Sequence, residues 1–66
     1  MMVSSQPSRK VKKMLRAAGW IPTTAQGSHT KWRAPSGRSV TVPDGHRSIS
    51  PGVYRQILRA IEEESR

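Results

Sequence analysis

The sequence contains no cysteine and no phenylalanine, and it has four acidic residues and no long apolar run. Without cysteine, the chain can form neither a disulfide framework nor a cysteine-based zinc site. Two histidines and four acids, three of them consecutive, also argue against a closed metal site, so we expect neither a metal nor a cofactor. The apolar runs are too short for a membrane span or the core of a signal sequence, and we expect a cytoplasmic protein without a membrane partner.

Positive charge is what the chain has in excess. Twelve lysines and arginines against four acids give a net charge of +8 and a pI near 11.6. In a chain of 66 residues, this balance favours a polyanionic partner, most often nucleic acid, over solubility alone. The length predicts one domain over residues 1–66, with residues 1–6 frayed. A core of this size contributes little stability, so burial in a partner or a dimer is also expected.

Two segments have apolar residues at helical spacing, which predicts two amphipathic helices. The first covers residues 7–18, with a stripe formed by Val11, Met14, Leu15 and Ala18, and the second covers residues 51–64, with Val53, Ile57, Leu58 and Ile61. Ser4 or Ser5 is expected to cap the first helix, and Gly19 is expected to end it in a left-handed conformation. Ser50 followed by Pro51 is typical of a helix start. The three glutamates at positions 62–64 either fray or face the basic first helix.

Between these helices lie three segments with strand character. They cover residues 20–24, 28–34 and 38–42, with turns expected at 25–27 and 35–37. In the middle strand, alternation places His29, Lys31 and Arg33 on one face and Trp32 on the other. Trp32 is therefore expected in the core, and Trp20 is expected to fold back on the last turn of the first helix. Val40 and Val42 are expected opposite Trp32. We predict an α+β fold with the order α-β-β-β-α: a two-layer sandwich in which both helices cover one face of a three-stranded antiparallel sheet.

The order of these motifs resembles the HicA toxin family over about residues 15–61. The residues that carry the resemblance are Gly27, Ser28 and His29, then Ser36, Gly37 and Arg38, the run from 40 to 43, and Pro51 and Gly52 followed by Arg55, Ile57 and Leu58. The resemblance implies a fold similar to a double-stranded-RNA-binding domain and a toxin of a type II toxin–antitoxin system that cleaves messenger RNA. It also implies a HicB-like antitoxin, which we expect to cover the His29 face. The histidine of the family's Gly-Ser-His motif is catalytic and corresponds to His29.

Metal-free RNA cleavage needs a base for the ribose 2′-hydroxyl, an acid for the leaving oxygen and cations for the charge on phosphate. Histidine suits either proton-transfer role, because its ordinary pKa of about 6.5 lets both forms be populated near neutrality. We expect a single catalytic histidine, His29. The expected RNA contacts are Ser28, Lys31, Arg33 and Arg38, with Lys12, Lys13 and Arg16 on the first helix.

Several of these residues also have a non-functional interpretation. The cations of the first helix are explained equally well by a solvent-exposed helix face and by contact with RNA. Arg38 is explained by a surface charge beside a turn. His46 and Arg47 are interpreted as loop residues, although their loop could reach the site. The alternative function is a non-catalytic RNA-binding module of the same fold, and a third is a remnant whose main activity is binding the antitoxin.

Overall fold

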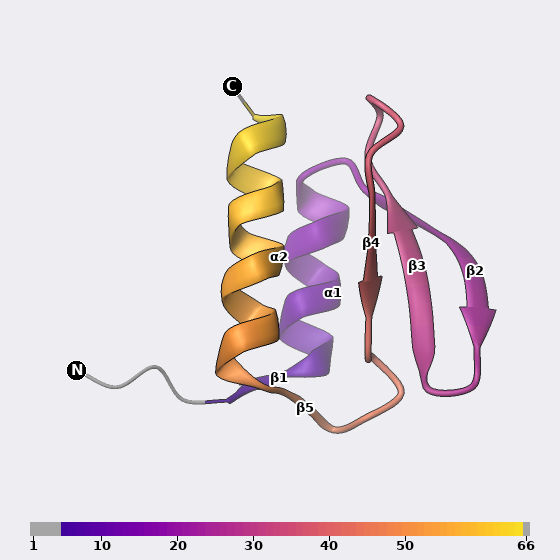
Figure 1. The fold of residues 1–66 in the computed structure, drawn as a ribbon, viewed down its shortest axis with the longest axis vertical. Helices are drawn as coiled ribbons and strands as arrows, with labels where there is room; N and C mark the ends of the chain where they lie inside the picture. Colours follow the sequence, from indigo (N-terminus) through magenta and orange to yellow (C-terminus); the bar gives the residue numbers. More distant parts are fainter. Residues whose placement is uncertain (1–4, 66) are drawn as a thin grey trace.

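The computed structural model describes residues 5–65 and contains two helices and two antiparallel sheets within that range. The elements in chain order are β1 (Gln6–Pro7), α1 (Ser8–Ala17), β2 (Ile21–Gln26), β3 (His29–Arg33), β4 (Ser39–Val42), β5 (Ser48–Ile49) and α2 (Pro51–Glu64). The main sheet has the order β2-β3-β4, and β1 pairs with β5. Both helices lie on the same side of the main sheet (Figure 1), which confirms the predicted α+β two-layer fold. Neither helix is long and apolar enough to cross a membrane.

Helix α1 ends where the sequence predicts and begins differently. Gly19 has a φ of 89°, and the Trp20 amide donates to the Leu15 carbonyl at 2.9 Å, which is the hydrogen bond of a glycine-terminated helix end. At the start, Pro7 is the capping residue and no side chain caps the helix. The predicted cap at Ser5 is therefore wrong, and Ser4 lies outside the described residues.

The short β1–β5 pair explains this difference. Gln6 pairs with Ile49, and Pro7 pairs with Ser48. The first amide of α1, that of Ser8, donates to the Arg47 carbonyl at 3.0 Å. A backbone carbonyl from the distant β4–β5 loop thus satisfies one amide that a capping side chain would otherwise serve. The expected fraying of residues 1–6 does not extend to Gln6, and residues 1–4 are not described.

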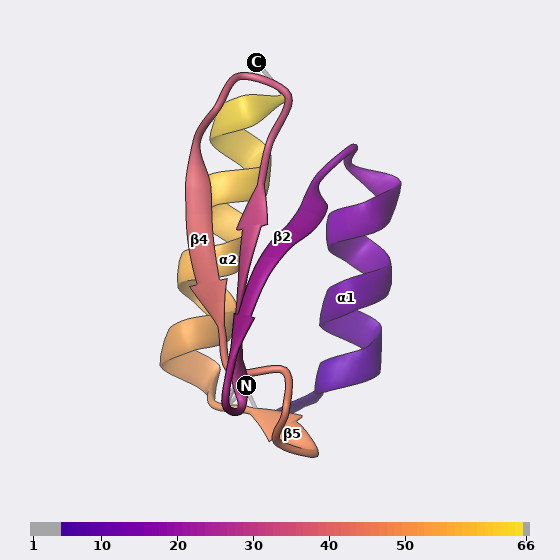
Figure 2. The ribbon, with the colours of Figure 1, turned by 90° about the vertical axis from the view of Figure 1, so that its right-hand side faces the viewer.

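Helix α2 begins as predicted, with the Ser50 hydroxyl accepting from the Val53 amide at 3.4 Å. Its C-terminal end contacts the hairpin between β3 and β4. Glu63 forms a 2.5 Å ion pair with Arg38, and Glu64 accepts a hydrogen bond from Ser36. These two glutamates therefore follow neither predicted alternative. They lie against the tip of the hairpin rather than α1, because the helix runs along the β4 side of the sheet (Figure 2).

The register of the main sheet places one apolar side toward the helices. Trp32 pairs with Val40, and Thr30 pairs with Val42, close to the predicted pairing. Strand β2 reaches Gln26, two residues further than predicted, since it pairs with β3 up to His29. The turn consequently shifts to residues 27–28, and Gly27 has a φ of 62°.

The core confirms the predicted alternation of β3. Trp32 is 1% exposed, whereas His29, Lys31 and Arg33 are exposed. The largest fully buried side chains are Trp20, Trp32, Leu15, Ile49, Ile57, Val11 and Val42. Trp32 is therefore a core residue, as predicted, and Trp20 is a core residue as well. Neither offers a ring on which an RNA base could stack. The helices cover the inner face of the sheet, and the outer face carries the polar residues of β3.

Candidate functional site

Two loops meet at the end of the molecule where α1 and α2 begin (Figure 1). One is the β2–β3 turn with Gly27 and Ser28, and the other is the β4–β5 loop at residues 43–47. The Gly45 amide donates to the Ser28 carbonyl at 2.8 Å. A Cβ atom at Gly45 would lie 2.5 Å from the Ser28 Cα and 2.9 Å from its carbonyl oxygen, well inside van der Waals contact. Glycine at position 45 thus allows the two loops to approach each other closely.

This approach brings both histidines of the chain to one serine hydroxyl. Ser28 Oγ lies 3.2 Å from His46 Nε2 and 3.4 Å from His29 Nδ1. The two imidazole centroids are 6.3 Å apart, with the ring planes at 84°. A hydroxyl can donate to one neighbour and accept from another, so Ser28 can hold one ring nitrogen in each role. Both imidazoles are exposed, and each can therefore reach a ligand in solvent.

Asp44 attaches the β4–β5 loop to the inner side of β3. Its Oδ1 accepts from Thr30 Oγ1 at 2.7 Å, and its Oδ2 accepts from Trp32 Nε1 at 3.1 Å. The carboxylate thereby satisfies the indole N–H of an almost fully buried tryptophan. Since Asp44 precedes His46 by two residues, these bonds also limit where the His46 backbone can lie.

Lys31 is the predicted cation that stays near His29. The two side chains line a shallow hollow of ≈160 Å³ together with Thr24, Gln26 and Thr41. An ammonium beside an imidazole suits a phosphate group, because the cation offsets the charge of the phosphate oxygens while the ring exchanges a proton.

The other predicted strand cations lie further away. Arg33 belongs to a separate hollow beside Gly37, at the opposite end of the strand. Arg38 forms the ion pair with Glu63. The structure therefore does not bring Arg33 or Arg38 to the histidine pair, and Arg38 also has a structural partner.

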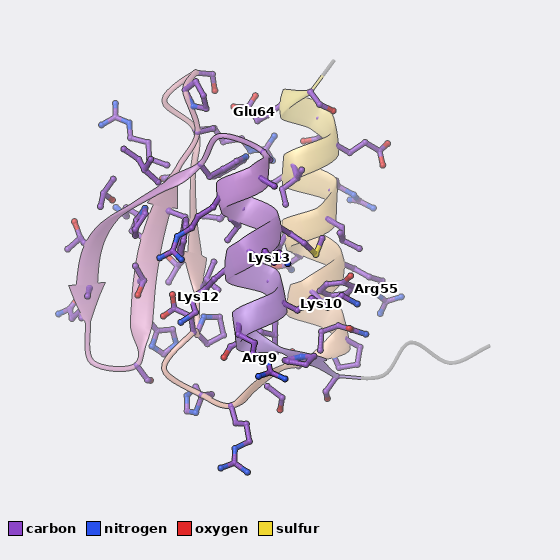
Figure 3. The ribbon with its side chains drawn as sticks, turned by 180° about the vertical axis from the view of Figure 1, so that it is seen from behind. Arg9, Lys10, Lys12, Lys13, Arg55 and Glu64 are labelled. Carbon is purple, nitrogen blue, oxygen red and sulfur yellow. The ribbon has the colours of Figure 1, made fainter. Side chains whose placement is uncertain are left out.

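The cations of the first helix form a row of their own. Figure 3 shows Arg9, Lys10, Lys12 and Lys13 along α1, on the side of the molecule facing away from the view of Figure 1. The Arg16 guanidinium lies 5.5 Å from the centroid of the Trp32 ring, within the range of a cation–π contact. Arg16 thus has a packing role, whereas Lys13 is exposed and Lys12 is half-buried.

From the sequence, His46 is interpreted as a loop residue, and the structure places it 3.2 Å from Ser28 Oγ. The pairing of the strands could have indicated that its loop lies near Ser28. Because Val42 pairs with Thr30, the residues after Val42 must pass close to Ser28 and His29. The register alone does not say which of the loop residues points toward Ser28, and that orientation follows from the contacts of Asp44 and Gly45.

Within residues 5–65, no three histidine and acidic side chains come together in a group that could hold a metal ion.

Comparison with known proteins gave one match. The model of the HicA toxin of bacterial toxin–antitoxin systems matches residues 8–62. This range includes α1, the main sheet, the two loops of the site and all of α2 except its last two residues. No curated protein and no solved structure matches the chain. The family match covers most of the 66 residues and contains Ser28, His29 and His46. The chain therefore belongs to the HicA toxin family of bacterial toxin–antitoxin systems.

Proposed function

We propose that this toxin is a metal-independent endoribonuclease that cleaves messenger RNA at the pair formed by His29 and His46. The observation that carries the proposal is the Ser28 hydroxyl between the two imidazoles, at 3.4 Å from His29 and 3.2 Å from His46. The sequence predicted one catalytic histidine, and the second group needed for proton transfer was missing. The pair supplies an acid and a base on one exposed surface, with Lys31 beside it.

The chemistry uses the RNA as its own nucleophile. One imidazole accepts the proton of the ribose 2′-hydroxyl as the oxygen attacks the adjacent phosphorus. The bond from phosphorus to the 5′-oxygen breaks, and that oxygen takes a proton from the other imidazole. The products are a 2′,3′-cyclic phosphate and a free 5′-hydroxyl, so protons and atoms balance. The Lys31 ammonium stabilises the negative charge that develops on the phosphate oxygens.

His29 and His46 take opposite roles in this scheme. His29 lies in the hollow with Lys31, while His46 lies on the other side of Ser28. Ser28 orients both rings and is a positioning residue.

The first test is the substitution His29→Ala. We expect cleavage of RNA and growth arrest to be lost, while the affinity for RNA stays near that of the unaltered protein, because the cations remain. The matched control is Gln56→Ala on the exposed side of α2, which should cleave normally. Cleavage by His29→Ala at the normal rate would show that the catalytic assignment is wrong. Activity should also survive a chelator, and its complete loss would contradict the metal-free mechanism.

A non-catalytic RNA-binding module is the second candidate function. The net charge of +8 and the cation row of α1 support it independently of the histidines. One experiment distinguishes the two functions. If the purified protein, free of antitoxin and of contaminating nuclease, binds RNA and never cleaves it, the binding module is the correct function.

The family membership implies an antitoxin partner. We propose that this partner is a HicB-like protein that covers the His29 face, and that the toxin acts on messenger RNA in the cytoplasm. Support comes from the geometry, because one bound surface at the β2–β3 turn would block both imidazoles and Lys31 at once.

A further inference from the structure

A second and larger hollow lies on the other side of His46. Its volume is ≈610 Å³, and its lining residues are Pro7, Ser8, Arg9, Asp44, Gly45, His46 and Arg47. The hydrogen bond from the Ser8 amide to the Arg47 carbonyl joins its two walls, as does the β1–β5 pairing. Figure 3 shows Arg9 at the first turn of α1, beside the β4–β5 loop. This hollow is therefore formed by the fold itself, where the start of α1 meets the β4–β5 loop.

The groups that line the hollow suit an anion. Arg9 and Arg47 are exposed and come from different segments, so two guanidinium groups can approach one ligand from two sides. The acid in the lining, Asp44, has its two oxygens bonded to Thr30 and Trp32. Each carboxylate oxygen thus has a partner within the protein, and the two guanidinium groups outnumber this single negative charge in the lining.

Ser8 lines the same hollow. The residue is 9% exposed, and its hydroxyl can add a hydrogen-bond donor to the two guanidinium groups. The first turn of α1 also has no acidic residue and no side-chain cap, so the positive end of the helix dipole is left uncompensated next to that hydroxyl.

His46 forms a wall of this hollow and contacts Ser28 at the histidine pair. A group bound in the hollow is consequently a direct neighbour of a group bound at the pair. RNA carries one phosphate at every nucleotide, so a strand cleaved at the pair would bring its adjoining phosphate to the arginines.

We propose that this hollow binds a backbone phosphate of the RNA substrate adjacent to the phosphate that is cleaved. The inference rests on the proposed ribonuclease function and extends it, because it assigns the substrate a path from Lys31 past the histidine pair to Arg9 and Arg47. Its contribution is to binding, and proton transfer stays with the two histidines.

The test compares two double variants that each remove two positive charges. Arg9→Gln with Arg47→Gln alters the hollow, and Arg55→Gln with Arg59→Gln alters the exposed side of α2. We expect the first to raise KM for RNA about tenfold with kcat nearly unchanged, and the second to leave both constants unchanged. In a His29→Ala background, the Arg9 and Arg47 double variant should also reduce the slope of the logarithm of the RNA-binding constant against the logarithm of the salt concentration by about 1. Equal effects of the two double variants would overturn the proposal, because charge alone would then explain them.

A second measurement does not depend on cleavage. Titration of the protein with inorganic phosphate, followed by amide NMR, should shift the signals of Ser8, Arg9 and Arg47 at concentrations that leave α2 unaffected. The Arg9 and Arg47 double variant should lose these shifts. If phosphate binds there and the protein never cleaves RNA, the anion site stands and the ribonuclease function fails. If RNA is cleaved and no phosphate shifts appear, the proposed site is wrong. Shifts produced by the antitoxin and not by phosphate would assign the hollow to that protein and overturn the proposal.

Discussion

At the scale of single residues, the geometry of the candidate site depends on two small residues, a serine and a glycine. Ser28 lies within hydrogen-bonding distance of both imidazoles, and Gly45 lets the loop of His46 approach Ser28. Neither residue can transfer a proton in the proposed reaction. Their effect is geometric, because proton transfer depends on ring nitrogens held at the correct distance and angle.

Substitution Ser28→Ala tests the positioning role. We expect kcat to fall about tenfold, with KM and the free energy of unfolding nearly unchanged, because Ser28 is at the surface and its backbone bond to Gly45 remains. The control is Ser39→Ala, the same chemical change at an exposed position of β4, which should have no effect. Normal kcat in Ser28→Ala would mean that the hydroxyl does not orient the rings.

Gly45→Ala tests the close approach of the two loops. The added Cβ would lie 2.5 Å from backbone Cα of Ser28, so the loops must separate. We expect the free energy of unfolding to fall by about 1–3 kcal/mol, measured by urea denaturation, together with reduced cleavage as His46 moves away.

The matched control for this change is Gly52→Ala. No atom lies within 4 Å of a Cβ built at this position, and the residue is in the first turn of α2. There the substitution should stabilise the protein by about 0.5 kcal/mol, because alanine favours the helix. Equal destabilisation by both changes would contradict the steric explanation.

At the scale of elements, two contacts join segments that are distant in sequence. The β4–β5 loop is attached to β3 through Asp44, and the end of α2 is attached to the β3–β4 hairpin through Glu63 and Glu64. The second contact is exposed, and such ion pairs contribute little stability. The first involves a buried indole N–H, and we expect it to matter more.

Asp44→Ala tests the attachment of the loop to β3. It would leave Trp32 Nε1 without its acceptor, so we expect a loss of about 2 kcal/mol in the free energy of unfolding and slower cleavage. Trp32→Phe removes the N–H, and a double-mutant cycle between the two positions should give a coupling of about 1 kcal/mol. Additive effects would show that the indole bond does not contribute. As a comparison, Glu63→Gln should cost less than about 0.5 kcal/mol.

At the scale of the whole molecule, a net charge of +8 on 66 residues acts on both partners of the toxin. The charge attracts RNA, and it attracts any antitoxin with an acidic surface. Under the proposed function, RNA and antitoxin compete for the same surface, and an antitoxin on the His29 face would block the site. The cation row on α1 (Figure 3) extends the positive field over the helix side of the molecule.

The antitoxin interaction should show this electrostatic origin. We expect its association rate to fall at least about tenfold from low to high ionic strength, with a smaller change in dissociation rate. Hydrogen exchange of the complex should show protection at Ser28 and His29. An inhibited complex in which these amides exchange as fast as in the free toxin would contradict inhibition by covering the site.

Local patterns in the sequence determined the two helices, the Gly19 and Ser50 helix ends, and the alternation of β3 that buries Trp32 and exposes His29. These features depend on neighbours within a few residues, so periodicity and capping chemistry are enough to predict them. The family and the catalytic assignment of His29 came from motif order, and the family match confirmed the first of these.

Tertiary structure alone placed His46 beside Ser28. Ser28 and His46 are 18 residues apart, and Asp44 is 14 residues from its partner Thr30. The start of α1 likewise depends on Arg47, and the position of Arg38 depends on Glu63, which is 25 residues away. The pairing of β3 with β4 narrows the region that these loops can occupy. Their final conformation depends on how closely glycine lets two backbones approach and on which buried donors a single carboxylate must satisfy.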